Sequence, residues 1–442
     1  MFTKVRLVNF RSFDDITFDL TQKKGQIKHF AVIYGENGMG KSNLARGIAA
    51  LIDLLRTMDV RDLLDSLLSD ENFRKLTEVL GDRRPTALVR DIQTLIQEYR
   101  MVGATEPIRL EYEFLIEGRT GRYCVELGET EIIHERLEYV LDKRRGVYFD
   151  LTPSVQKINT SIFKDNTVLK DIKELVKQYW GKHTLLAILL HEQNNKAERY
   201  INEGLSSNFY NLIRHLSDLS CYLRGHQETR GVLKNNVGFL VELEEGTISK
   251  SKKEMLDNAE HVLSNLFCAI CSDNRRLFYK TREQNEKIHY ELYIQKLIAG
   301  KEREIKFTQE STGNHQLLNI FPYLLRAMLG GTVVIDEIET GIHDFLMKKI
   351  LEELIPSIQG QLIVTSHNTS LMEIDNIRAS VYIIKEDTMA NKEILCIDNY
   401  EQRTYQQNNI RERYKNNAYK GIPRVEKIDF EALLKILCTV NK

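Results

Sequence analysis

The chain has 442 residues, of which 42% are hydrophobic and 28% charged, proportions typical of a folded globular protein rather than a disordered one. Its 62 Lys and Arg residues are balanced by 63 Asp and Glu residues, so the net charge gives no reason to expect sequence-independent nucleic-acid binding by the whole molecule. No apolar run approaches the ~18 residues needed to span a membrane, and the N-terminus lacks a signal h-region. We therefore expect a cytoplasmic protein, without membrane contact, built as one large insertion-bearing domain or as two domains.

The first part of the chain predicts a strand pair, a loop and a helix, followed by an antiparallel sheet. "KVRLVNF" alternates apolar and polar residues like a strand, "DDITFDL" is its expected hairpin partner, and "HFAVIYG" is a short buried strand. After "GENGMGKS", the stretch "NLARGIAALIDLLRTM" has helical spacing, which continues to about residue 100. The period then changes to two as far as "RRGVYFDL", which favours an antiparallel meander.

The second part of the chain predicts helices followed by alternating strands and helices. Residues 166–275 have long, charged helical patterns, and we interpret them as a large helical insertion because they separate two halves of one sheet domain. Strands resume at "IHYELYIQK", and a helix over about 314–328 precedes the buried strands "GTVVIDE", "QLIVTSH" and "SVYIIKE". Such alternation implies a parallel sheet. The tail after residue 400 is rich in Asn, Gln, Tyr and Arg and ends in a predicted amphipathic helix.

These patterns predict an α/β fold with four segments. They are an N-terminal lobe over 1–165, the helical insertion over 166–275, a C-terminal lobe over 276–400 and a tail over 401–442.

The segment "GENGMGKS", Gly35 to Ser42, satisfies the phosphate-binding pattern G-x-x-x-x-G-K-[ST] in full and lies between a predicted strand and a predicted helix. In this pattern backbone amides surround phosphates, Lys41 contacts the β and γ phosphates, and Ser42 binds Mg²⁺. The alternative is a chance glycine-rich turn. The remaining residues that we expect to line the nucleotide are Asn37, Gly38, Gly40 and Asn43.

Two acids follow the buried strand "TVVI", where a phosphate site needs a second Mg²⁺ contact and a water-activating base. Asp336 would hold Mg²⁺, and Glu337 would orient the attacking water. The alternative is a helix N-cap region with favourable acids. The long stretch between Lys41 and Asp336 excludes a compact G-protein-like domain and suits an ATP-binding-cassette head divided by an insertion.

Three weaker candidates surround these motifs. Ser311 and Gly313 open the helix before the acidic strand, where they could contact the γ-phosphate of ATP held by a second subunit, or only cap the helix. His367 ends the strand "LIVTSH" and could sense the γ-phosphate, or be a capping histidine. Arg11 in "NFRSF" could reach nucleotide phosphate, or be an exposed arginine without such a role.

Taken in order, "NFRSF", "GENGMGKS", "STGNHQ", "VVIDEIETGIH" and "IVTSHN" resemble the SMC-, RecF- and OLD-like branch of ABC-type ATPases. They also resemble the stand-alone AAA-family ATPases of bacterial anti-phage operons, such as those of PARIS and Septu. The resemblance covers roughly residues 1–55 and 305–385, together with "RERYKNNAYKGIP" in the tail. It implies an ABC-type P-loop head with a parallel core sheet and an antiparallel β lobe, binding ATP and Mg²⁺.

The resemblance also assigns roles to single residues. It makes Asp336 the acid on the Mg²⁺ side, Glu337 the catalytic base and His367 the switch histidine. Ser311 and Gly313 become contacts to a second subunit. Glu339, Gly341 and His343 stand where the family has an acid and a D-loop that ends in histidine, so Glu339 and His343 are expected at the seam between subunits. The chain departs from the family at Asn314 and His315, and no glutamine-loop residue stands out.

The same resemblance suggests partners. OLD-type nucleases carry a long Toprim domain after the ATPase, whereas only residues 368–442 follow His367 here, without a D-x-D acidic cluster. We therefore expect a homo-oligomeric ATPase that controls a separate nuclease or toxin and responds to a phage trigger protein. The alternative is a RecF-like DNA-repair ATPase, in which "TISKSKKEM", "DKRRG" and "DNRR" would contact DNA.

Overall fold

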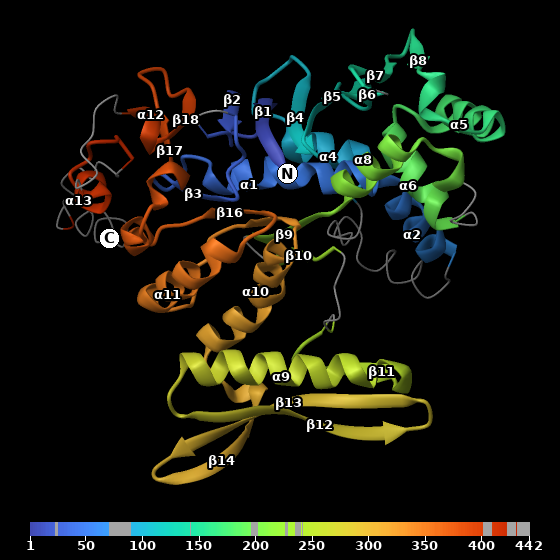
Figure 1. The fold of residues 1–442 in the computed structure, drawn as a ribbon. Helices are drawn as coiled ribbons and strands as arrows, with labels where there is room; N and C mark the ends of the chain where they lie inside the picture. Colours follow the sequence, from blue (N-terminus) through green and yellow to red (C-terminus); the bar gives the residue numbers. More distant parts are fainter. Residues whose placement is uncertain are drawn as a thin grey trace, which may run out of the picture.

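The computed structural model contains two large sheets that enclose one helix, with a smaller sheet beyond them (Figure 1). None of the described helices is long and apolar enough to cross a membrane. The structure describes residues 1–442 except 23–24, 70–89, 142, 196–201, 226–228, 235–239, 241, 401–408, 422–429 and 431–442.

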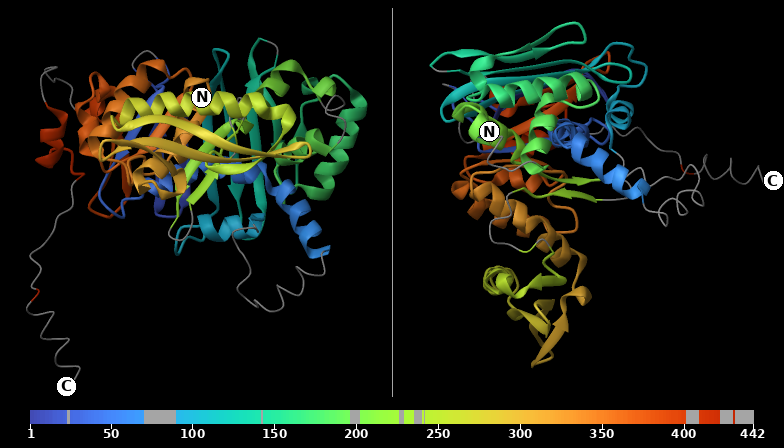
Figure 2. Two further views of the ribbon diagram at one scale, coloured as in Figure 1. Left: turned by 90° about the horizontal axis from the view of Figure 1, so that it is seen from below. Right: turned by 90° about the vertical axis from the view of Figure 1, so that its right-hand side faces the viewer.

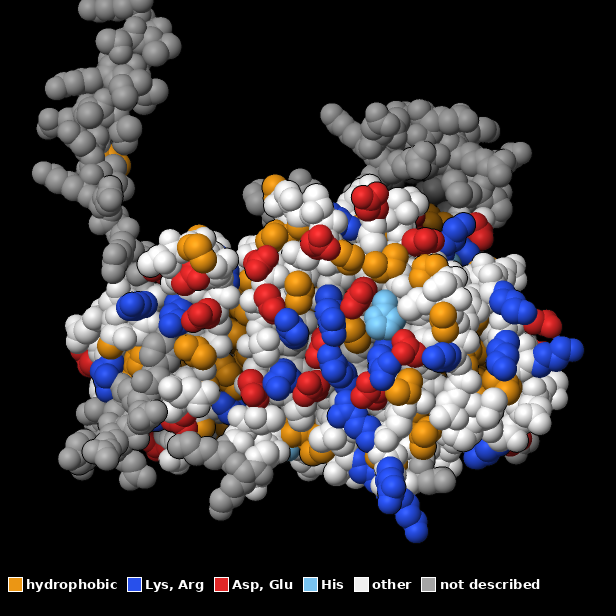
Figure 3. All heavy atoms as spheres, turned by 90° about the horizontal axis from the view of Figure 1, so that it is seen from above, with side chains coloured by type: hydrophobic (Ala, Val, Ile, Leu, Met, Phe, Trp, Pro, Cys, Tyr) orange, Lys and Arg blue, Asp and Glu red, His pale blue; other side chains and the backbone are white. Residues whose placement is uncertain are grey.

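The antiparallel sheet has the order β2-β1-β4-β5-β6-β7-β8, which confirms the predicted hairpin and meander. Its outer face carries basic and acidic side chains side by side (Figure 3), and many of them form ion pairs, such as Arg122 with Glu111 and Arg145 with Glu138. The strands are β1 Phe2–Phe10, β2 Phe13–Asp19, β4 Ile108–Ile116, β5 Arg119–Leu127, β6 Ile132–Val140, β7 Arg145–Leu151 and β8 Gln156–Ile158.

The central sheet has the order β10-β9-β15-β16-β3-β17-β18, with a parallel core from β9 to β17 and an antiparallel strand at each edge. The predicted mixed sheet with a parallel core and an antiparallel β lobe is therefore correct. The strands are β3 Phe30–Tyr34, β9 Leu219–Arg224, β10 Thr229–Val232, β15 Thr332–Ile335, β16 Gln361–Thr365, β17 Val381–Glu386 and β18 Lys392–Cys396.

Helix α1, Lys41–Leu55, lies between the two large sheets and is buried on nearly every side. The stretch "GIAALIDLL" suits this position because it is apolar around the whole helix rather than along one face. Gly47 allows α1 to approach β1 closely, since a Cβ atom there would overlap Leu7. The hydroxyl of Tyr112 on β4 donates to the Gly47 carbonyl oxygen at 2.8 Å, which fixes the helix against the antiparallel sheet.

The two faces of the central sheet belong to two hydrophobic cores. Val334 and Ile363 point into the core shared with α1 and the antiparallel sheet, whereas Val333 and Leu362 point into a second core on the opposite face. Strand alternation explains this division, because neighbouring side chains in a strand face opposite ways. The helices that cover the second face are α10 Thr312–Met328 and α11 Asp344–Leu354.

A small antiparallel sheet and helix α9 form a projecting unit, which we call the arm, residues 245–306 (Figure 1 and Figure 2). Helix α9 packs on one face of the sheet through Leu263 and Phe267, and Leu277 and Leu292 face it from the strands. The elements of the arm are β11 Glu245–Ser249, α9 Lys253–Ile270, β12 Asn274–Gln284, β13 Lys287–Ile298 and β14 Lys301–Lys306.

The predicted boundaries of the helical insertion at 166–275 do not match this arrangement. Helices α5, α6 and α8 do form, but they pack into the same core as α1. Strand β9 belongs to the central sheet, because it pairs in parallel with β15, and the boundary at 275 cuts through β12. The helices outside the arm not yet given are α2 Thr57–Ser69, α4 Ile92–Tyr99, α5 Asn166–Tyr179, α6 Leu185–Asn195, α8 Ser207–Ser217, α12 Ile397–Tyr400 and α13 Ile410–Lys415.

Part of the tail packs on the head. Tyr414 of α13 lies 5.8 Å from Tyr34 between ring centroids, and Arg411 forms an ion pair with Glu373 at 2.7 Å. The predicted C-terminal amphipathic helix falls mostly outside the described residues.

A buried carboxyl group joins the antiparallel sheet to the loop before α6. Glu135 on β6 is fully buried and accepts hydrogen bonds from the Tyr123 hydroxyl, the Trp180 indole N–H and the Leu185 amide, at 2.9, 2.9 and 2.7 Å. Burial raises the pKa of Glu135 to about 7, although these donors favour the charged form.

The raised pKa of Glu135 predicts that the free energy of unfolding depends on pH. The folded state holds this proton more tightly than the unfolded state, so the stabilisation is complete below the ordinary pKa near 4.5 and declines as pH rises through about 7. Chemical denaturation of the wild type and Glu135→Gln should differ in pH slope by about 1.4 kcal/mol per pH unit within this window. Equal slopes for the two proteins would contradict this assignment.

Candidate active site

The glycine-rich loop between β3 and α1 has the geometry of a phosphate cradle. Gly38 and Gly40 have left-handed backbones, with φ of 82° and 98°, and a Cβ on Gly40 would lie 2.8 Å from the Phe13 ring. Gly40 is the N-cap of α1 and offers no side chain to the helix amides, and the first turn has no acidic residue. The free amides and the helix dipole therefore favour an anion at this end of α1.

Lys41 lies folded back onto this loop. Its ammonium group donates to the carbonyl oxygens of Gly35 and Glu36 at 2.8 and 3.0 Å, and the residue is buried. Burial lowers the pKa of Lys41, while the charges of Asp336, Glu337 and Glu339 act in the opposite direction. Because all three acids influence the ammonium group, the structure brings the acidic segment and the loop together, as the sequence predicted.

Asp336 is the innermost of the three acids. It is 1% exposed, and its Oδ1 accepts a hydrogen bond from the Thr365 hydroxyl at 2.6 Å, whereas its buried Oδ2 has no hydrogen-bond partner among the described residues. Burial raises the pKa of Asp336, and the Thr365 and Ser42 hydroxyls oppose this shift. A buried oxygen without a partner, close to a serine hydroxyl, fits the predicted Mg²⁺ contacts of Ser42 and Asp336.

Within the described part of the chain, no group of three or more His, Cys, Asp and Glu side chains is placed to hold a metal ion.

Glu337 begins the loop that follows β15. Its φ of 50° is unusual for a residue with a side chain, and its amide donates to the Thr365 hydroxyl oxygen at 2.8 Å. Its carboxylate accepts a hydrogen bond from the Thr340 hydroxyl at 3.1 Å. The loop thus holds the Glu337 carboxylate beside the nucleotide loop, a position suited to the base assigned from the sequence.

Glu339 connects this loop to the end of β16. Its Oε1 accepts from the His367 amide at 2.5 Å, while its Oε2 is buried without a partner among the described residues. The His367 side chain is exposed. His343 is also exposed, and it caps α11 by accepting from the Phe345 amide at 3.3 Å. The structure therefore links Glu339 to the backbone of His367 within one chain.

The start of α10 meets the same loop. Ser311 is the N-cap, accepting from the Asn314 amide at 3.3 Å, and is exposed. Gly313 lies so close to the loop that a Cβ there would be 2.6 Å from the Gly341 carbonyl oxygen. No contact with the chain's own phosphate loop is recorded for Ser311 or Gly313 among the described residues, so the structure leaves the predicted contact to a second subunit open.

The two departures from the family pattern have a structural explanation. The Asn314 amide group donates to Glu310 at 2.7 Å, and the His315 ring lies 3.2 Å from the Glu244 carboxylate and 5.2 Å from the Phe307 ring. Glu244 and Phe307 flank the arm at its two ends. These positions therefore attach the first turn of α10 to the base of the arm.

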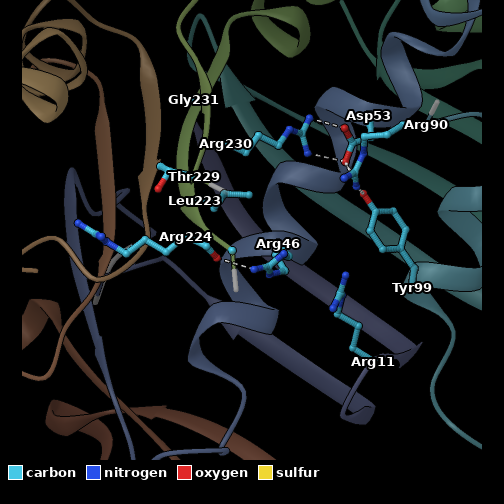
Figure 4. A pocket seen from close by; sticks show the side chains of 11 residues that line it. Arg11, Arg46, Asp53, Arg90, Tyr99, Leu223, Arg224, Thr229, Arg230 and Gly231 are labelled. Atoms are coloured by element: carbon cyan, nitrogen blue, oxygen red, sulfur yellow. Dashed lines mark hydrogen bonds and ion pairs between the residues drawn. The ribbon is translucent and has the colours of Figure 1, made fainter. Parts of the chain in front are cut away.

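Three of the predicted nucleotide contacts lie at the edge of the site. Asn37 is exposed at the tip of the loop, and the Asn43 amide group donates to the Ser12 hydroxyl oxygen at 2.8 Å. Arg11 has a left-handed backbone, and its guanidinium lies 5.9 Å from the centroid of the Tyr99 ring and 4.0 Å from Glu98 (Figure 4). The recorded contacts of Arg11 are therefore away from the loop, and its role toward nucleotide stays a prediction.

Sequence reasoning gave no role to Thr365 or Thr340, although both orient the acids. The available signal was the parallel pairing of β15 with β16: Ile335 opposite Val364 places Asp336 beside Thr365. No glutamine-loop residue was predicted. The end of β9, beside β15, is followed by residues 226–228, which lie outside the described part of the chain.

Comparison with known proteins agrees with this geometry. A family model described as "AAA domain, putative AbiEii toxin, Type IV TA system" matches residues 30–373, from β3 to just beyond the switch histidine. The chain belongs to this family. The match spans both lobes and the arm, so family membership covers every predicted nucleotide residue except Arg11.

Solved structures that are similar to this chain include SMC heads. An SMC head bound to the C-winged helix domain of ScpA is 13% identical, with a TM-score of 0.42, over 89% of this chain and 96% of that one. The SMC head domain from Thermotoga maritima is 14% identical, with a TM-score of 0.37, over 89% of this chain and 98% of that one. An SMC head with an extended coiled coil, bound to the C-terminal domain of ScpA derived from Pyrococcus furiosus, is 12% identical. Its TM-score is 0.37, over 100% of this chain and 99% of that one. A search of curated protein sequences finds no match.

The double role of Thr365 predicts a selective effect on Mg²⁺. Thr365→Val removes the hydroxyl that donates to Asp336 and accepts from the Glu337 amide, so it should weaken Mg²⁺ binding in the presence of nucleotide by about tenfold or more. Thr365→Ser keeps the hydroxyl and should remain within about threefold of the wild type. Titration of Mg²⁺ against a fluorescent ATP analogue measures both, and equal affinities for Thr365→Val and Thr365→Ser would refute the role.

Proposed function

We propose that this chain is a Mg²⁺-dependent ATPase that hydrolyses ATP to ADP and phosphate. The observation that carries the proposal is the meeting of Lys41 and Ser42 with the buried Asp336, whose Oδ2 has no hydrogen-bond partner among the described residues. Membership of a family with an AAA domain supports it. In this role Lys41 leaves the carbonyl oxygens of Gly35 and Glu36 and turns to the phosphates of ATP.

The other residues around the phosphates have separate roles in binding and hydrolysis. The amides at the start of α1 bind the phosphates, and bound Mg²⁺ neutralises part of their charge. Glu337 accepts a proton from the attacking water, after its carboxylate leaves the Thr340 hydroxyl. Glu339 holds the His367 amide, which sets the position of the histidine beside the γ-phosphate.

We further propose that two heads engage face to face with ATP between them, so that the protein is at least a homodimer. Ser311 and Gly313 are then contacts to the nucleotide of the partner subunit. Two observations support this: Ser311 is exposed at the first turn of a helix, and the same turn touches Gly341 of the acidic loop. A subunit that closed over ATP would press on both elements together.

We also propose that these ATPase heads are the sensor and regulator of an anti-phage defence system, controlling a separate nuclease or toxin and responding to a phage trigger protein. The family description, which names a toxin and a toxin–antitoxin system, supports an association with a toxic activity. The arm offers a route for control, because His315 and Glu244 join its base to the first turn of α10. Nucleotide-driven movement of this turn would therefore reach a partner bound to the arm.

The alternative of a DNA-repair ATPase receives less support. The basic stretches proposed as DNA contacts contain residues paired with carboxylates, including Lys250 with Glu283 and Arg276 with Glu260. The outer face of the antiparallel sheet mixes both signs of charge (Figure 3). Neither surface forms the uninterrupted basic patch that would attract a phosphate backbone.

Glu337→Gln should reduce ATP hydrolysis by about 100-fold or more while leaving ATP bound, because it removes a general base but no phosphate ligand. Sedimentation velocity with Mg²⁺ and ATP should then show a persistent dimer or larger assembly. Lys41→Ala is the contrasting variant, since it should bind no nucleotide and form no ATP-dependent assembly. Hydrolysis by Glu337→Gln at the wild-type rate would disprove the assignment of the base.

The defence role predicts a phenotype in cells. Plating of a panel of phages on cells that carry this gene with its neighbouring reading frame should show fewer plaques, and Lys41→Ala should abolish this protection. Deletion of the neighbouring frame should do the same, because the damaging activity resides in the partner. If protection were absent throughout the panel, or persisted in Lys41→Ala, the defence role would be wrong even if the ATPase activity were present.

A further inference from the structure

A cavity of about 370 Å³ opens beside α1, one helical turn beyond Ser42. It lies between α1, the β9–β10 hairpin, the turn after β1 and the end of α4 (Figure 4). None of its described lining residues belongs to the phosphate loop or to the acidic segment. The lining residues are Arg11, Arg46, Asp53, Arg90, Tyr99, Leu223, Arg224, Gly225, Thr229, Arg230 and Gly231.

Asp53, which carries the one carboxylate among the described lining residues, already accepts hydrogen bonds from its neighbours. Asp53 is 5% exposed, and its two oxygens accept hydrogen bonds from both terminal nitrogens of Arg230, from Arg90 at 3.2 Å and from the Tyr99 hydroxyl (Figure 4). The Asp53 charge raises the pKa of Arg230 against the effect of burial. Asp53 therefore balances Arg230 and Arg90 and has little capacity left for the other arginines.

The other three arginines lack a close carboxylate. Among the described residues, no carboxylate lies within 4.0 Å of Arg46 or Arg224, and Arg11 reaches only Glu98, at 4.0 Å. The Nε atoms of Arg11 and Arg224 are buried without a hydrogen-bond partner in the described structure. Burial and the charge of Arg46 both lower the pKa of Arg11, so the two neighbouring cations repel each other.

We propose that this cavity binds a small phosphorylated molecule, with its phosphate held by Arg11 and Arg46. Planar guanidinium groups match the oxygens of a phosphate, and the buried Nε donor of Arg11 would gain the acceptor that it lacks. The volume is near the lower end of the range of about 300 to 1,000 Å³ for ligand pockets, which suits a molecule of nucleotide size or smaller. A recessed cavity of this size favours a free small molecule over the backbone of a nucleic-acid duplex.

The position of the cavity gives its ligand a means to change the nucleotide site. Arg46 donates to the Arg224 carbonyl oxygen at 2.5 Å, and Arg224 donates to Gln316 of α10 at 3.0 Å and to the Thr340 carbonyl oxygen at 3.4 Å. The Arg224 side chain itself lies on the α10 side of β9, like that of Tyr222. A phosphate that draws Arg46 therefore acts on the phosphate-loop helix directly, and through the Arg224 backbone it acts on the first turns of α10 and the acidic loop.

Calorimetric titration of inorganic pyrophosphate tests the site apart from the nucleotide site. Lys41→Ala protein, in which the phosphate loop is disabled, should bind one equivalent, as should wild type saturated with Mg²⁺ and a non-hydrolysable ATP analogue. Arg46→Gln in the Lys41→Ala background should weaken this binding by about tenfold or more, because it removes a charge-assisted contact. Arg119→Gln, which removes an exposed arginine on β5, is the matched control and should stay within about twofold.

Each other outcome has a definite meaning. Absence of binding to Lys41→Ala, or loss of binding when the analogue fills the phosphate loop, would overturn the proposal, the latter by assigning the arginines to the ATP site itself. Displacement of pyrophosphate by a short DNA duplex, at equal phosphate concentration, would replace the small molecule with nucleic acid. Should Arg46→Gln fail to fold by circular dichroism, Arg11→Gln provides the same test. Because binding is measured without hydrolysis, failure of the ATPase proposal would leave this result unaffected.

Discussion

The hydroxyl group of Thr365 is the interaction on which the acidic half of the site depends. It donates to the Asp336 carboxylate at 2.6 Å and accepts from the Glu337 backbone amide at 2.8 Å, so one atom holds the side chain of the first acid and the backbone of the second. This is possible because β15 and β16 are parallel neighbours and end at the same edge. Asp336 is nearly inaccessible to solvent, and burial raises its pKa, so each hydrogen bond to its charged form matters more there than at the surface.

The same edge of the sheet connects the acidic loop to the rest of the molecule. Glu339 binds the His367 amide, and Gly313 packs against Gly341, so the acidic loop touches both the end of β16 and the first turn of α10. From that turn, His315 reaches Glu244 at the base of the arm. These are short, direct contacts between rigid elements, and a change in the loop cannot occur without a change in at least one of them.

Local patterns predicted most of the head and the centre of the site. The strand before Gly35, the all-round apolar helix after Ser42 and the strand before Asp336 carry signals within about ten residues, which is the range over which periodicity is informative. Strand β9 was missed because its pairing partner β15 is more than 100 residues away and because helix α8 directly precedes it. The link between Thr365 and Asp336 depends on the same kind of distant register, and the arm's outline depends on which hairpins pair.

Helix α1 connects the phosphate loop to the arginine cavity. Lys41 and Ser42 lie at its first turn, Arg46 one turn later and Asp53 in its last turns, and nearly every residue between them is buried. The contact between Gly47 and Leu7 leaves no space for the helix to shift toward β1. Dense packing on nearly every side lets such a helix transmit strain along its length. Helix α1 is therefore the element through which the proposed ligand of the arginine cavity and the proposed nucleotide would influence each other.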